Sequence, residues 1–169
     1  FSGHIITAPA VSIFVAILII YLKEKNKKEL LFTAVNLEIG GIETSLINLA
    51  NRIDKNKYNV TIILEEKKGV LLNRLNKNIK VLEVKVSNNK NIIIRKTVNT
   101  LRRLVFTVFN YHNYDFSCCY ATYGLSGNKL SKIASSNNSI YIHSDYKYVY
   151  KNINDFHTFF DKRNIKDFK

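Results

Sequence analysis

The sequence has few of the residues from which disulfide frameworks and metal centres are built. It contains no tryptophan or methionine, one proline, six glycines and only two cysteines, the neighbours Cys118 and Cys119. Adjacent cysteines seldom bridge, and a metal site needs more ligands at wider spacing. Both cysteines lie in an apolar run, where an unpaired cysteine behaves as a small buried hydrophobic residue. We therefore expect a reduced, cytosolic setting and no disulfide framework.

The excess of positive charge does not define a partner by itself. The chain carries 26 Lys and Arg residues against 13 Asp and Glu residues, a net charge of +13. Such a balance suits nucleic acid or an anionic membrane surface. The lysines, however, are spread along the chain among many asparagines and isoleucines. The chain also lacks a recognition-helix motif and a set of stacking aromatic residues interleaved with basic ones, so we expect no nucleic-acid partner.

The longest stretch without charge is Ile5–Leu22, which has about the minimum length of a membrane-spanning helix. It is followed at once by Lys23, Lys25, Lys27 and Lys28, and positive residues flank the cytoplasmic end of a span. We predict that residues 1–28 form a membrane anchor with a basic flank, which places the rest at the cytoplasmic face of the cell membrane. The alternative is a cytoplasmic protein with a mis-assigned gene start, or a segment packed on a partner. Because the first residue is Phe1, we expect the chain to be part of a longer protein.

The remaining 29–169 segment predicts one domain, with enough residues for a hydrophobic core and no repeat or proline-rich linker. Its central stretch, Leu30–Glu66, predicts a βαβ unit. An apolar run, Leu30–Val35, leads through a loop ending in Gly40 and Gly41 to a helical pattern that begins at Ile42 or Glu43 and ends near Asp54; a second apolar run is Val60–Leu64. The apolar face of this helix comprises Leu46, Ile47, Leu49, Ala50 and Ile53.

Strands and helices continue to alternate beyond this unit. The pattern predicts a short helix in Gly69–Asn78, a less buried strand in Ile79–Val86, an amphipathic helix in Ile92–Phe109, a strand in Tyr114–Tyr120, a polar turn in Thr122–Gly127, a helix in Asn128–Ser135 and a strand in Ser139–His143. We interpret helix Ile92–Phe109 as an outer helix with a solvated basic face. The alternation predicts an α/β fold, a Rossmann-like parallel sheet with helices on both faces.

Gly40 and Gly41 lie where the first strand leads into a helix. Glycines at this point allow a close approach of the backbone to a ligand and can take dihedrals closed to other residues. The first amides of a helix favour an anion. Neither the P-loop pattern nor G-x-G-x-x-G is present. The alternative is a tight turn in which Glu43 complements the helix dipole.

Ligands of parallel α/β sheets bind beyond the carboxyl ends of the strands. Three segments occupy such positions: Asn36–Gly41, Tyr120–Ser126 and His143–Asp145. Among the four histidines of the sequence, only His143 lies at the carboxyl end of a predicted strand with polar neighbours. The alternatives are that His143 is a structural residue bonded to nearby backbone and that Asp145 caps the next helix.

Two stretches, NLEIGGIETSLINLANRIDKNKYNVTIILEE and SIYIHSDY, resemble the amino-terminal, acceptor-side domain of GT-B glycosyltransferases of the family 4 type. The resemblance implies that residues 29–169 form this Rossmann-like domain. It implies that the Gly-Gly loop lies beside the donor diphosphate and that the strand-end histidine reaches the donor sugar. A second domain with paired glutamates would complete the enzyme beyond Lys169, so this chain alone would bind acceptor at most.

The implied activity is transfer of a hexose, with retention, from a nucleotide-sugar donor to a surface-polysaccharide or lipid-linked acceptor, without a metal or other cofactor. On this hypothesis His143 is the catalytic residue, and Gly40, Gly41, Glu43, Ser144 and Asp145 bind substrate. Similar enzymes dock on membranes through a basic helix, which gives Ile92–Phe109 a second interpretation as a lipid-contacting helix. The alternative function is a non-catalytic, membrane-associated Rossmann-like module that binds phosphate or a polyanion.

Overall fold

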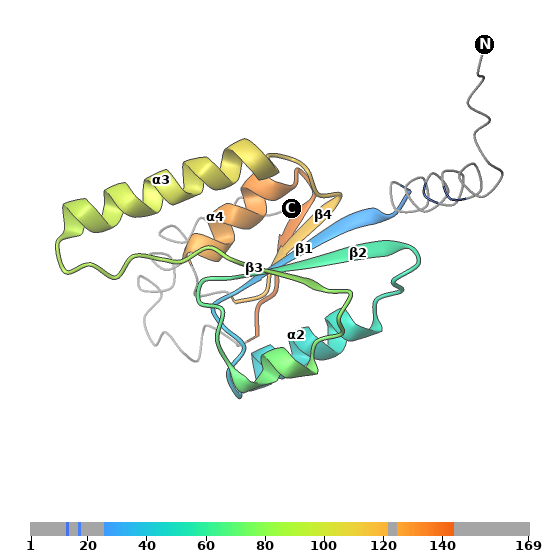
Figure 1. Ribbon diagram of the computed structural model, residues 1–169. Coiled ribbons are helices and arrows are strands. Elements are labelled where there is room, and N and C mark those ends of the chain that lie inside the picture. Colours follow the sequence, from blue (N-terminus) through green and yellow to red (C-terminus); the bar gives the residue numbers. More distant parts are fainter. Residues whose placement is uncertain (1–12, 14–16, 18–25, 122–124, 144–169) are drawn as a thin grey trace, which may run out of the picture.

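A five-stranded parallel sheet forms the centre of the fold (Figure 1). The computed structural model describes residues 13, 17, 26–121 and 125–143. Within them the elements follow one another as β1 (Lys28–Ala34), α2 (Gly41–Arg52), β2 (Tyr58–Leu64), the 3₁₀ helix η1 (Val70–Arg74), β3 (Lys80–Glu83), α3 (Ile92–Asn110), β4 (Phe116–Cys119), α4 (Leu125–Ala134) and β5 (Asn138–Ile140).

The strand order is β3-β2-β1-β4-β5, and each neighbouring pair is parallel. The chain therefore builds outward from β1 to β3 and then returns to the other side of β1 to form β4 and β5. The reversal places a topological switch point between the carboxyl ends of β1 and β4, where ligands of open α/β sheets bind. The predicted parallel α/β fold is confirmed.

Two hydrophobic clusters pack against opposite faces of the sheet. Helix α2 lies below the sheet in Figure 1, while α3 and α4 lie above it. Successive residues of β1 point to opposite faces, so Phe32 joins the α2 cluster and Leu31 joins the cluster with Phe106 and Leu130. Because both faces of β1 are covered, its last four residues are all buried, as expected for a central parallel strand.

Several predicted boundaries need correction. The strand predicted at Ile79–Val86 is confirmed as the less buried β3 but is shorter. The predicted turn Thr122–Gly127 is wrong at its end, because α4 already begins at Leu125 and Gly127 lies inside it. A Cβ on Gly127 would lie 2.9 Å from Thr33 Oγ1 and 3.4 Å from Cys119 Sγ. The glycine therefore allows the first turn of α4 to pack closely on the sheet.

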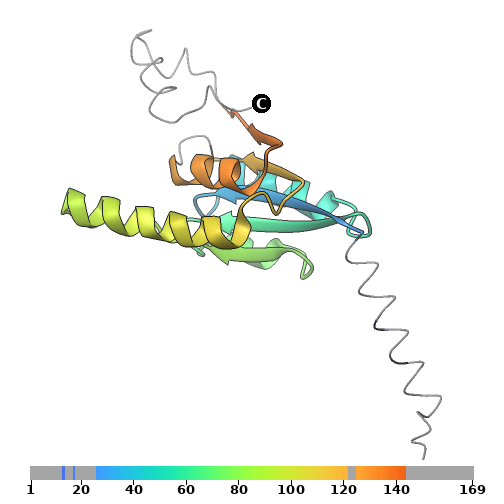
Figure 2. The same cartoon turned by 90° about the horizontal axis from the view of Figure 1, so that it is seen from above.

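Helix α3 exposes much of its apolar surface, which the sequence did not predict. Phe106 is the only residue of α3 that is buried. Leu101 is 61% exposed, Val108 78% and Phe109 71%. Arg95, Lys96 and Arg102 are also exposed, in agreement with a solvated basic side. In both views the N-terminal part of α3 extends past the neighbouring α4 (Figures 1 and 2).

No helix within the described residues is long and apolar enough to cross a membrane. The predicted anchor, Ile5–Leu22, lies outside the described residues except for Ile13 and Ile17. Ser144 and Asp145, two of the predicted substrate-binding residues, also lie outside them.

Candidate functional site

The Gly-Gly loop connects β1 to α2 at the switch point. Gly40 is the N-cap of α2 in an extended conformation, with φ −167° and ψ 163°, and Gly41 is the first helical residue. Neither has the positive φ that would require glycine, so the idea that this loop uses dihedrals closed to other residues is wrong. A Cβ on Gly41 would meet no atom within 4 Å, so its backbone faces open space.

Glu43 turns back over this loop. Its carboxylate occupies the space that a Cβ on Gly40 would fill. A carboxylate in the first turn stabilises the positive end of the helix dipole, which is the role that the turn-only alternative gave to Glu43. An anionic ligand at the α2 amides would therefore have to displace a flexible, half-buried side chain.

Gly69 lies in the connection that follows β2, and the backbone of the Gly-Gly loop packs directly against it. Its φ of +122° lies where L-residues are strained, and a Cβ there would overlap the carbonyl group of Leu37 and the nitrogen of Glu38. The two connections are joined by backbone hydrogen bonds, from Leu37 N to Lys68 O at 2.9 Å and from Leu71 N to Leu37 O at 3.1 Å. Leu37 is fully buried, so the loop is anchored in the α2 cluster.

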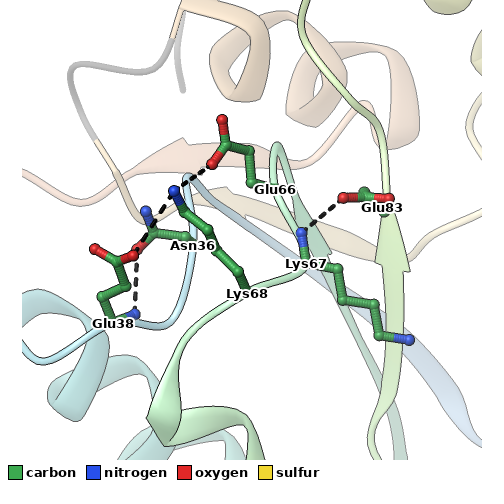
Figure 3. A network of polar contacts seen from close by, with 6 residues as sticks. All are labelled: Asn36, Glu38, Glu66, Lys67, Lys68 and Glu83. Carbon is green, nitrogen blue, oxygen red and sulfur yellow. Dashed lines mark hydrogen bonds and ion pairs between the residues drawn. The ribbon is translucent and has the colours of Figure 1, made fainter.

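Charged side chains add a second set of contacts between these connections (Figure 3). Lys68 Nζ lies 2.6 Å from Glu66 Oε2 and 3.7 Å from Glu38 Oε1. The ion pair lowers the pKa of Glu66 and raises that of Lys68. All three side chains are exposed, so water and salt screen these pairs. The backbone hydrogen bonds of Leu37 to Lys68 and Leu71 therefore hold the loop more firmly.

An aromatic cluster stands on the other side of the switch point. Tyr120 follows β4, and its ring stacks on Tyr141 with centroids 4.9 Å apart. The Tyr120 hydroxyl reaches Ser45 Oγ on α2 at 2.8 Å, so the cluster is tied to the helix that carries the Gly-Gly loop. His143 contacts both tyrosines, with ring centroids 4.9 Å from Tyr120 and 4.4 Å from Tyr141.

One nitrogen of His143 is already committed to the protein. Its Nε2 lies 2.8 Å from the carbonyl oxygen of Tyr120. A carbonyl oxygen only accepts, so Nε2 carries a proton and donates it. In the neutral ring, Nδ1 is then left with a lone pair that can accept a hydrogen bond from a hydroxyl group. Nε2 therefore makes the bond to nearby backbone that the structural alternative predicted for His143, while Nδ1 can still accept a hydrogen bond from a ligand.

A groove of about 850 Å³ connects these features. It contains both predicted glycines, Gly40 and Gly41, and both stacked tyrosines, Tyr120 and Tyr141; the remaining lining residues come from the loop and α2, namely Ile39, Thr44, Ser45, Asn48, Leu49 and Arg52. His143 is not one of these lining residues, but its ring contacts both tyrosines that line the groove. Leu49, predicted to be in the core, is exposed here. Tyr120 begins the predicted strand-end segment Tyr120–Ser126, whereas Tyr141 and the polar side of α2 were not predicted as site residues.

Two titratable groups near the switch point are shielded from solvent, Glu65 partly and Cys119 fully. Burial raises the pKa of Glu65, whose carboxylate also accepts the Gly127 amide. Burial raises the pKa of Cys119 to about 12. Cys118 and Cys119 are both buried free thiols, which confirms their prediction as small hydrophobic residues. The described part of the chain holds no cluster of three His, Cys, Asp or Glu side chains that could bind a metal ion.

The fold and the position of this groove define a Rossmann-like parallel α/β domain with a candidate binding site at the switch point. No protein-family model matches the sequence, and no curated protein matches it. The particular function is therefore inferred from the chemistry of the site and from the sequence patterns that led to it.

Proposed function

We propose that the chain is the acceptor-side domain of a GT-B glycosyltransferase that moves a hexose from a nucleotide-sugar to a surface-polysaccharide or lipid-linked acceptor. The observation that carries the proposal is the groove between the Gly-Gly loop and the Tyr120–Tyr141–His143 cluster. The groove combines the open backbone of Gly40 and Gly41, the rings of the two tyrosines, hydroxyl and amide side chains of α2, and the cation Arg52. A sugar diphosphate requires such a combination, because its hydroxyls need hydrogen-bond partners and its phosphates need donors.

Each site residue takes a distinct role in this proposal. The amides of Gly40 and Gly41 neutralise charge that develops on the diphosphate leaving group. Glu43 turns away from Gly40 and accepts a hydrogen bond from a sugar hydroxyl. Nδ1 of His143 accepts a hydroxyl of the transferred hexose, while the bond from Nε2 to Tyr120 holds the ring in place. Ser144 and Asp145 remain proposed substrate contacts beyond the described residues.

A membrane surface is the proposed location of the acceptor. Support comes from α3, whose exposed Leu101, Val108 and Phe109 lie on a helix with no acidic residue and four cations. An amphipathic helix of this kind buries apolar side chains at the lipid boundary while its cations meet anionic headgroups. The proposed anchor in Ile5–Leu22 would also hold the domain at the membrane.

The test measures hexose transfer by the full-length protein that contains this chain. A panel of labelled nucleotide-sugars is incubated with a membrane extract, and transfer is compared between wild type, His143→Asn and His112→Asn. His112 is exposed and has φ +51°, which asparagine tolerates, so His112→Asn is a matched control. We expect His143→Asn to lower turnover about tenfold or more with the melting temperature retained, because one hydrogen bond to the reacting sugar is lost.

Two results would overturn the proposal. Absence of transfer from every nucleotide-sugar in the panel would remove the glycosyltransferase activity. Wild-type turnover by a folded His143→Asn variant would leave the histidine with its structural bond to Tyr120 only. In the second case the groove loses its catalytic residue, even if binding persists.

A further inference from the structure

A second cavity, of about 420 Å³, lies between α3 and α4. It is on the α3–α4 side of the sheet, whereas the groove of the Gly-Gly loop is on the α2 side (Figure 1). Four of the residues that line it are cations: Arg95, Lys96 and Arg103 on α3 and Lys129 on α4. Among the residues that the structure describes, no Asp or Glu lines this cavity.

The positions of the cations follow from helical geometry. Arg95 or Lys96 and Arg103 are separated by about two turns of α3, so they project from one side of the helix. That side faces the first turn and a half of α4, which contributes Lys129. Asn99, between them in the sequence, is held in place because its Oδ1 accepts the Ser87 amide at 2.7 Å.

These positive charges are not compensated within the described residues. None of the four side chains has a hydrogen-bond or ion-pair partner there, whereas Arg102 donates to Lys85 O at 2.7 Å. Partial burial, and in second place the charge of the nearby Arg103, lower the pKa of Lys129. Glu65, whose carboxylate accepts the Gly127 amide of α4, does not line the cavity.

We propose that the cavity between α3 and α4 binds the phosphate group of a small phosphorylated molecule or of a lipid headgroup. Arginine presents a planar fork that matches phosphate oxygens, and lysine adds a point charge. Four cations suit a ligand with two or more negative charges. The cavity is larger than one phosphate, and Asn99, Thr100 and Ser126 offer polar partners for the group that the phosphate carries.

The test titrates inorganic pyrophosphate into the full chain by calorimetry at about 0.15 M salt, where exposed charges are screened. The pocket variant is Arg103→Gln with Lys129→Gln. Its control, Arg74→Gln with Lys77→Gln, changes the net charge equally at two exposed residues away from the cavity. We expect the pocket variant to bind about 100-fold more weakly, because two charged contacts are lost, and the control about as tightly as wild type. The pocket variant should melt no earlier than wild type, because it removes repulsion between cations.

Vesicles separate the two sources of phosphate. Co-sedimentation with phosphatidylcholine vesicles that contain phosphatidic acid is measured for the same variants, with pyrophosphate as competitor. Loss of vesicle binding in the pocket variant and competition by pyrophosphate would identify a lipid headgroup. Tight pyrophosphate binding with unchanged vesicle binding would identify a soluble ligand. Equal weakening in both variants, or absence of pyrophosphate binding to the wild type, would overturn the proposal.

Discussion

Replacing Gly69 by alanine should destabilise the protein more than any other glycine-to-alanine change in its loops. The added methyl group would enter the space of the Leu37 carbonyl and the Glu38 nitrogen, and φ would stay at +122°. A strained φ of this kind costs about 1–3 kcal/mol. Moving Leu37 away also weakens the two backbone hydrogen bonds that it makes to Lys68 and Leu71, each worth about 1 kcal/mol. The expected loss is about 3–5 kcal/mol.

Gly41→Ala is the matched control, because the same methyl group would there meet no atom within 4 Å. Gly41 begins a helix, where alanine is favoured over glycine by up to about 1 kcal/mol. Urea unfolding followed by circular dichroism gives the free energy of unfolding of both variants. Gly69→Ala within about 1 kcal/mol of wild type would refute the reasoning, because the loop would then tolerate a side chain at its closest backbone contact.

The remaining predictions concern buried groups and the surface of α3. In the folded protein Cys119 should resist iodoacetamide at pH 8, because a pKa of about 12 leaves roughly one thiol in 10,000 ionised; rapid native-state labelling would contradict its burial. Glu65→Gln should raise the melting temperature at pH 7. Burial raises the pKa of Glu65, so its charged form opposes folding above the usual carboxyl pKa and the gain should vanish in acid; a gain independent of pH would contradict this. Leu101→Ser with Val108→Ser should weaken binding to anionic vesicles, whereas Ile39→Ser, at an exposed isoleucine outside α3, should not; equal effects would contradict a role for α3.

The sheet could be predicted because its central strands are buried on both faces and are therefore continuous apolar runs in the sequence. Leu30–Val35 and Val60–Leu64 are continuous apolar runs, as both faces of a central parallel strand are covered. Gly40 and Gly41 then mark the start of α2. These signals are local, and they correctly place the loop and the strand ends at one edge of the sheet. The same signals could have placed Tyr120 and Tyr141 at that edge, but they contain no information that the two rings stack on each other.

What the sequence did not predict depends on contacts between distant segments. Gly69 requires glycine because Leu37, in another connection, passes against it. Gly127 was predicted to be a turn residue, yet it lies in α4, and it is a glycine there because Thr33 and Cys119 leave little room for a Cβ. The hydrogen bond from His143 to the Tyr120 carbonyl joins two strand ends and decides which ring nitrogen remains for a ligand. No local pattern contains these distances.

Helix α3 illustrates the limit of periodicity most clearly. The pattern of Ile92–Asn110 shows that the helix has a basic side and an apolar side, but it does not determine which of them faces the rest of the protein. Here Phe106 packs into the core, Arg103 lines the cavity beside α4, and Val108 faces outward. An exposed apolar side lowers solubility unless it contacts another apolar phase, and clustered cations favour an anion. The orientation of α3 therefore generates both of its proposed surfaces, the apolar surface for a membrane and the cationic cavity for a phosphate. The vesicle experiment with the Leu101 and Val108 variant tests the first surface, and the pyrophosphate experiment tests the second.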